Sequence, residues 1–281
     1  MSSDLLPEST LTHYLEELRS RMDAITDSLS VQERSGDTAR FLATVRDTSD
    51  STIRPAPAAA QRALARTRNP DIGIAQLVQV VEEDPTLGQA LLRYANSAYY
   101  ATGSVTVSLR QAAQRVGVSG IHNVVLGVML DGMLCRPGGR FEVMLDQVRA
   151  HLVRTAPIAR TLARAFRLPA DECFALALLH DAGKLIVFDV LGTMRHELRR
   201  DVAVPDAVVT RVLRDAHEAL GALAALHWRL GETTAHPIGT HHRSPVPVAA
   251  DRMSEVLFLA ERADHALARG GAMDVAAWCE Q

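Results

Sequence analysis

The pattern of apolar and polar positions predicts helices along most of this chain. The first apolar stripe alternates steps of four and three residues, a heptad-like seam, and consists of Leu11, Leu15, Leu18, Met22, Ile25 and Leu29. With a second short helix at about 38–47, residues 1–53 are expected to form an N-terminal helical extension. The seam is only about three heptads long. Two alternatives therefore stay open: it docks onto the main domain, or it pairs two chains in a homodimer.

After this extension the helical pattern repeats through a main domain at 54–281. Asp84 is expected to cap a helix with Pro85 at its first position, and Gly117 is expected to end a helix. The Pro- and Gly-rich run Arg136–Arg140 divides the domain into lobes at about 54–136 and 140–270. The expected helices are 58–68, 73–82, 84–95, 108–117, 119–134, 142–166, 170–182, 184–199, 205–214, 215–229, 234–243 and 252–269. The fold class is all-α, because no run alternates with period two for long enough to make a strand.

Composition narrows the class of protein. The chain has 281 residues, 47% of them hydrophobic, and a formal net charge of −3, so no strongly basic field points to nucleic acid or an anionic membrane. Its cysteines, Cys135, Cys173 and Cys279, are odd in number and far apart, which fits a reducing compartment and gives no disulfide framework. Without a signal-like start or a bilayer-length apolar run, the sequence predicts a cytoplasmic protein.

The dipeptide His180-Asp181 is the strongest chemical signal. It lies near the end of an apolar stretch that reads as helix, and burying both groups is costly unless they are paired. A divalent metal would pair them, since imidazole and carboxylate are common ligands. The alternative is a helix C-terminus with Gly183 as a left-handed stop. The dipeptide alone does not decide between the two.

Asp264 is the second unusual position. It lies in the apolar stripe of Leu257, Ala260 and Leu267, where a carboxylate needs a metal or a buried arginine as partner. The solvent face of the same helix is expected to carry Glu261, Arg262, His265 and Arg269.

Other histidines sit at inward-facing helix positions. His217 lies in the middle of an apolar face with Gly221 beside it, and His151 has a half-apolar setting. Taken singly, each is more often a hydrogen-bonded core residue than a metal ligand. Adjacent His241 and His242 point about 100° apart on a helix, so both can be ligands only at a cleft.

These segments together resemble the HDOD domain, a helical signalling module related to the HD superfamily of metal-dependent phosphohydrolases. The resemblance covers about 54–268 and rests on segments in both lobes, namely Val81–Leu87, Leu91–Tyr99, Leu109–Gly117, Ala177–Leu185, His217–Gly221 and His241-His242.

The resemblance also implies a site. Carried over residue by residue, the metal ligands are His151, His180, Asp181, His217, His241, His242 and Asp264. Lys184 matches a lysine that lies near the substrate phosphate in related phosphodiesterases. Two departures stand out: Gln147 replaces a glutamate of some two-metal members, and Arg243–Val248 replaces the Gly-Tyr-Pro loop of cyclic-di-nucleotide phosphodiesterases. Hydrolysis of cyclic di-GMP is therefore not expected.

Three functions fit these observations. The favoured one is a non-catalytic regulatory module that binds a protein partner of a signalling pathway. The alternative is a phosphohydrolase acting on a phosphate ester or nucleotide, in which Asp181 bridges metals or acts as base and Lys184 holds the phosphate. Between them lies a metal kept as a structural staple or sensor. The mixed ligand set suits Fe, Mn or Zn.

Overall fold

The chain folds into α-helices, as predicted. The computed structural model describes residues 8–48, 53–55, 57–67, 69, 71–97, 100, 105–132, 136–242 and 252–268. Within these residues no β-strand occurs, and residues 105–107, the run nearest to a strand pattern, do not form one. The all-α fold class is confirmed. Among the described helices, none is both long and apolar enough to cross a membrane.

The chain divides into two compact units, Met1–Arg54 with Leu134–Gln281 (unit 1) and Pro55–Met133 (unit 2). Unit 2 is a cluster of helices in which α6 contacts each of the other three. Its helices are α3 (Ala58–Thr67), α4 (Ile74–Glu82), α5 (Pro85–Ala95) and α6 (Leu109–Gly132).

Local signals set the helix ends in unit 2. Asp84 caps α5: its Oδ1 accepts hydrogen bonds from the backbone N–H groups of Thr86 (2.8 Å) and Leu87 (3.3 Å), and Pro85 follows as predicted. Gly117 interrupts α6 with φ +71° and ψ −177°, so the predicted helix stop is confirmed.

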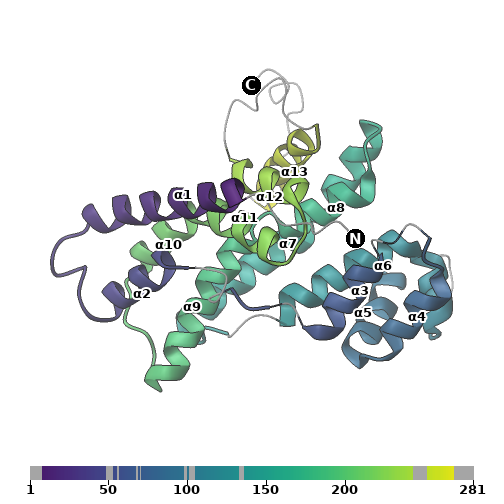
Figure 1. Ribbon diagram of the computed structural model, residues 1–281, viewed down its shortest axis with the longest axis horizontal. Helices are drawn as coiled ribbons and strands as arrows, with labels where there is room; N and C mark the ends of the chain where they lie inside the picture. The colour runs from purple at the N-terminus through teal and green to yellow at the C-terminus, as the bar shows by residue number, and fades with distance from the viewer. Residues whose placement is uncertain are drawn as a thin grey trace. The chain divides into compact units, whose positions relative to one another are not determined.

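Unit 1 carries the remaining helices (Figure 1). The long helix α7 packs against α8 and α13, while α11 packs against α9 and α12. These helices are α1 (Glu8–Asp27), α2 (Gly36–Arg46), α7 (Gly139–Ala165), α8 (Ala170–Leu179), α9 (Ala182–Leu198), α10 (Asp206–Asp215), α11 (His217–His227), α12 (Glu232–Thr240) and α13 (Arg252–Ala268).

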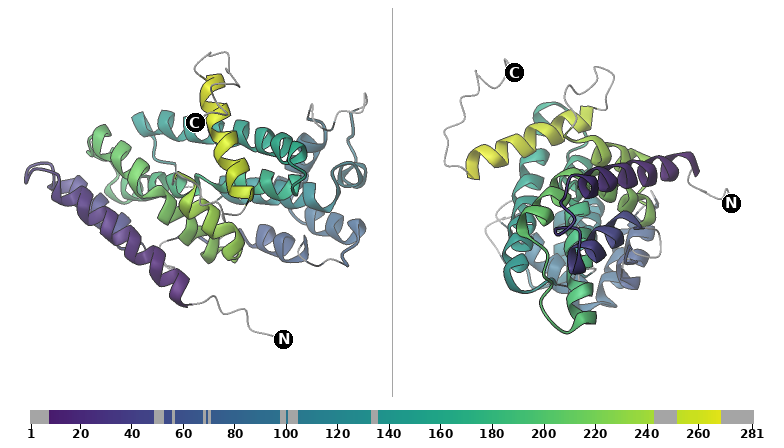
Figure 2. Two further views of the ribbon diagram at one scale, coloured as in Figure 1. Left: turned by 90° about the horizontal axis from the view of Figure 1, so that it is seen from above. Right: turned by 90° about the vertical axis from the view of Figure 1, so that its left-hand side faces the viewer.

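The heptad-like seam of α1 faces the rest of unit 1. Leu18, Met22 and Ile25 are at most 1% exposed, and α1 packs against α2, α10 and α11. Figure 2 shows the purple α1 beside the green helices α10 and α11 in its left view. A dimer built on this seam would have to displace these contacts. The apolar face of α1, for which both docking and dimerisation were open from the sequence, is covered by helices of the same chain.

Candidate metal centre

The His-Asp pair occupies the junction between α8 and α9. His180 closes α8 with helical dihedral angles, Asp181 precedes α9, and both are fully buried. Gly183 lies inside α9 and has no left-handed dihedral angle, so the alternative in which it ends the helix is wrong. Helix α9 begins again immediately after Asp181, which leaves no place for a stop.

Gly183 instead lets α9 and α11 touch. A Cβ atom there would collide with the carbonyl oxygen of His217 and lie 2.7 Å from the backbone nitrogen of Gly221. Two glycines at one crossing allow the backbones to approach more closely than side chains permit. This approach carries the first residue of α11, His217, to the side of Asp181.

The imidazoles are oriented by contacts on their outer nitrogens. The Nδ1 atoms of His180, His217 and His241 lie 2.7–3.0 Å from the backbone carbonyls of Ala177, Arg214 and Ile238. A carbonyl only accepts, so these Nδ1 atoms carry the proton and donate it. In the neutral ring the Nε2 atom is then a bare acceptor, which is the arrangement of metal-binding histidines.

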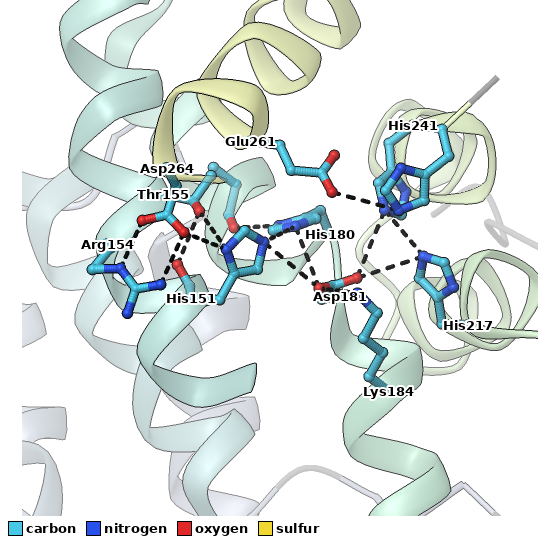
Figure 3. Close-up of polar contacts among 12 residues, drawn as sticks. His151, Arg154, Thr155, His180, Asp181, Lys184, His217, His241, Glu261 and Asp264 are labelled. Atoms are coloured by element: carbon cyan, nitrogen blue, oxygen red, sulfur yellow. Dashed lines mark hydrogen bonds and ion pairs between the residues drawn. The ribbon is translucent and has the colours of Figure 1, made fainter. Parts of the chain in front are cut away.

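These bare nitrogens converge in pairs on Asp181 (Figure 3). The Nε2 atoms of His151 and His180 are 3.1 Å apart, and those of His217 and His241 are 3.3 Å apart. The first pair lies 3.6–3.8 Å from Asp181 Oδ2. The second pair lies 3.6–3.7 Å from Asp181 Oδ1. Asp181 therefore stands between two half-sites.

The donor set fits a divalent metal. Two acceptor nitrogens at such distances repel each other unless a proton or a cation lies between them, and Asp181 Oδ1 is buried without a hydrogen bond among the described residues. Ligand atoms within 4.8 Å of one another form the groups Asp181–His217–His241–His242 and His151–His180–Asp181.

The protonation states of the side chains around Asp181 also bear on metal binding. Burial lowers the pKa of His180 to about 3, so its ring is neutral. Burial acts to raise the pKa of Asp181, but the neighbouring imidazoles and the Lys184 ammonium outweigh it and hold that pKa well below its usual range. Burial also lowers the pKa of His217, whereas at His241 the neighbouring Asp181 outweighs burial and raises the pKa. Neutral rings at His180 and His217 beside an ionised carboxylate are protonation states that metal binding requires.

Asp264 reaches the centre indirectly. Its Oδ2 lies 2.7 Å from His151 Nδ1. Its two oxygens also accept hydrogen bonds from Arg154 Nε (2.7 Å) and Nη2 (3.0 Å). The arginine partner that the sequence required is present, but the Arg154 side chain is half exposed and not buried. No ligand group described above contains Asp264, and its role as a ligand stays a prediction.

Glu261 was misplaced by the sequence analysis. It was expected on the solvent face of α13, but it is 3% exposed, while Leu267 of the expected stripe is 61% exposed. The error has a physical cause: α13 packs against both α7 and α8, so its buried face is wider than one stripe. Burial raises the pKa of Glu261 to about 7.

A pocket of about 580 Å³ opens onto the centre. His151, Asp181, His217 and His242 line it together with cationic side chains. Lys184, the predicted phosphate-binding residue, lies in this lining with its Nζ 2.6 Å from Asp181 Oδ2. The other lining residues are Arg21, Met144, Gln147, Val148, Thr210, Leu213, Arg214, Glu218 and His265.

Two further residues of this lining, Arg21 and Glu218, were not predicted from the sequence. Arg21 belongs to α1, and its Nη2 lies 3.5 Å from Glu218 Oε2. Glu218 Oε1 accepts the backbone N–H of His242 at 3.0 Å. The N-terminal helix thus connects to the paired histidines through one buried carboxylate. Residues 243–251 lie outside the described residues. They include Arg243–Val248, the run that stands where cyclic-di-nucleotide phosphodiesterases have a Gly-Tyr-Pro loop.

Comparison with known proteins points to one family. The HDOD domain family matches residues 53–244. An uncharacterized protein of Treponema pallidum (strain Nichols) is 28% identical over 196 residues, 66% of this chain and 36% of that protein. The chain thus spans about a third of that relative's length.

Solved structures share the fold at low identity. An HDOD domain protein of unknown function from Geobacter sulfurreducens superposes with a TM-score of 0.59 and 21% identity, covering 78% of this chain and 75% of that one. A protein from Shewanella amazonensis SB2B, provisionally named a metal-dependent phosphohydrolase, gives 0.62 and 15%, covering 90% and 82%. One from Marinobacter aquaeolei VT8, provisionally named a signal transduction protein, gives 0.58 and 22%, covering 88% and 54%.

Proposed function

This chain belongs to the HDOD domain family, and from the geometry of unit 1 we propose that it is a phosphohydrolase that works with one or two divalent metal ions. The observation that carries the proposal is Asp181, held between two pairs of imidazoles at the floor of an open pocket. A structural metal site is closed by protein ligands, whereas a catalytic one keeps a position open to substrate. The pocket beside Asp181 supports a catalytic metal site over a structural one.

A divalent ion in the centre would supply Lewis-acid activation of a phosphate oxygen and of the attacking water. His151, His180, His217, His241 and Asp181 would hold it, with Fe, Mn or Zn best suited to this mixture of donors.

The cationic residues of the pocket serve the substrate. Lys184 is 21% exposed and lies beside Asp181, so its ammonium can turn from the carboxylate toward a phosphate oxygen. Arg214 also lines the pocket with a 72% exposed side chain, and its guanidinium pairs with Asp215 at 2.6 Å. Apolar side chains on the wall, among them Met144 and Leu213, leave room for an organic group esterified to the phosphate.

One observation favours a second function, a regulatory module with a retained metal. Arg154 neutralises Asp264 with two hydrogen bonds, which leaves that carboxylate less able to bind a cation. The metal would then stabilise the packing of α7, α8, α11 and α12 without turnover.

Hydrolysis of bis(p-nitrophenyl) phosphate separates the two functions. We expect turnover by the full chain only after addition of Mn²⁺, Fe²⁺ or Zn²⁺, and a loss of more than about 100-fold in His180→Ala. His196→Ala is the matched control, because His196 is exposed on α9 and does not line the pocket over the centre.

The outcomes are distinct. Metal-dependent turnover that His180→Ala abolishes and His196→Ala keeps supports the phosphohydrolase. A chain that binds metal but cleaves no phosphate ester supports the regulatory module. Turnover that persists in His180→Ala contradicts the assignment of this centre.

A further inference from the structure

We propose that Glu261, and not Asp264, supplies the carboxylate of α13 to the metal centre. This inference rests on the proposed function, since it assigns a ligand to the same centre. The two acidic residues are three positions apart on one helix, so both turn toward the core, and the structure gives them different surroundings.

The oxygens of Asp264 are already engaged. Arg154 donates to both of them, and His151 Nδ1 lies 2.7 Å from Oδ2. Because His151 Nε2 faces His180 and Asp181, its Nδ1 lies on the opposite side of the ring, away from the centre. Asp264 thus orients the His151 ring from outside, as carboxylates behind metal-binding histidines do.

The carboxylate of Glu261 is in the opposite situation. No described residue donates a hydrogen bond to it, although its side chain is only 4% exposed. The contact that its Oε1 makes is with His242, whose Nε2 lies 3.5 Å away. A buried carboxylate without hydrogen bonds is costly, and a bound cation removes that cost.

The position of Glu261 is that of a ligand. Its oxygen lies within 4.8 Å of the ligand atoms of His180 and His241, and it forms a second such group with His151 and His265. In Figure 3 the Glu261 side chain extends toward the histidines, while Asp264 faces Arg154 at the edge of the cluster. Glu261 and Asp181 flank the His180 ring from two sides in that view. The ligand that α13 supplies therefore lies about one helical turn before Asp264, the residue predicted from the sequence.

Calorimetric titration with MnCl₂ tests this assignment. The full chain is stripped with a chelator and titrated as wild type, Glu261→Gln, Asp264→Asn and Glu255→Gln. Glu255 is the matched control, an exposed glutamate on the same helix. We expect Glu261→Gln to bind fewer Mn²⁺ ions, or to bind one at least about tenfold more weakly. Glu255→Gln should match wild type, and Asp264→Asn should keep the number of ions, because asparagine can still accept from His151.

Thermal unfolding shows whether the variant is folded. Without metal, Glu261→Gln should melt at or above the temperature of wild type, because a buried unpaired charge is removed. With Mn²⁺, wild type should gain more stability than Glu261→Gln, since a ligand stabilises the state that binds it.

Each result decides the matter. Equal Mn²⁺ binding by Glu261→Gln and Glu255→Gln overturns the assignment and leaves the proposed function standing. Loss of ions in Asp264→Asn overturns the outer role of Asp264. A wild-type chain that binds no Mn²⁺, Fe²⁺ or Zn²⁺ overturns both the assignment and the proposed function.

Discussion

At the scale of single residues, the centre depends on how each imidazole is held. A histidine on an apolar face carries little information alone, and the sequence analysis of His217 and His151 reflected that. The structure adds the partner of each Nδ1, which is a backbone carbonyl or a carboxylate in every one of the four converging rings. These partners fix the tautomer, so the Nε2 lone pairs point at one place.

Gly183→Ala tests the approach of α9 to α11 that brings the ligands together. The new Cβ would collide with the His217 carbonyl, so α11 has to move and carry His217 away from Asp181. We expect a loss of about 1–3 kcal/mol in the free energy of unfolding, measured by urea denaturation, and weaker metal binding.

Gly73→Ala is the control for this substitution, because a Cβ at Gly73 would meet no atom within 4 Å. If Gly183→Ala were as stable as Gly73→Ala and bound metal as wild type does, the close crossing would not be what positions the site.

Some features of single residues could be predicted from the sequence, and others could not. The Asp84-Pro85 cap and the Gly117 break were predictable, since each is decided by a few neighbouring positions. Glu261 was not, because a stripe drawn on one isolated helix gives no sign that two other helices cover α13. The carbonyl partners of the histidines were equally invisible, since backbone groups carry no sequence signal.

At the scale of elements, the N-terminal helices belong to the architecture of unit 1. Helix α1 buries its apolar seam against α10 and α11, and its Arg21 lines the pocket. Helix α2 is fastened at its start by Asp37, which accepts two hydrogen bonds from Arg200 (2.6 and 2.8 Å) and one from the backbone N–H of Ala203 (2.8 Å). These bonds tie α2 to the segment between α9 and α10.

Asp37 gives this tie a defined pH dependence. The Arg200 side chain and the Ala203 N–H lower the pKa of Asp37 from 3.8 to about 2. A carboxyl whose pKa is lower in the folded state stabilises the fold above its unfolded pKa and loses this contribution as the pH falls toward the folded value. Asp37→Asn should therefore cost about 1–2 kcal/mol at pH 6, and the difference from wild type should shrink between about pH 4 and pH 2.

Chemical denaturation at a series of pH values measures this difference. Asp27→Asn serves as the control, because the Asp27 side chain is 83% exposed. A difference between wild type and Asp37→Asn that stays constant down to pH 2 would contradict the role given to this carboxylate.

At the scale of the whole molecule, the site belongs to unit 1. None of the candidate ligands comes from unit 2. The family match ends at residue 244, so α13, which supplies Glu261 and Asp264, lies beyond it. The resemblance seen in the sequence extended to about residue 268 and did include Asp264. The fold class and the convergence of the predicted histidines on Asp181 could be predicted from the sequence. The different surroundings of Glu261 and Asp264 on α13 could not, because they depend on how α13 packs.

The central claim is that the imidazoles of unit 1 and Asp181 form a metal centre. X-ray anomalous scattering from crystals of the Mn²⁺-loaded full chain tests it most directly. We predict an anomalous peak that marks a Mn²⁺ ion within bonding distance of Asp181 and of the Nε2 atom of His180, His217 or both. Crystals with no ordered anomalous peak there, and with the Nε2 atoms of His151 and His180 still in direct contact, would contradict the claim.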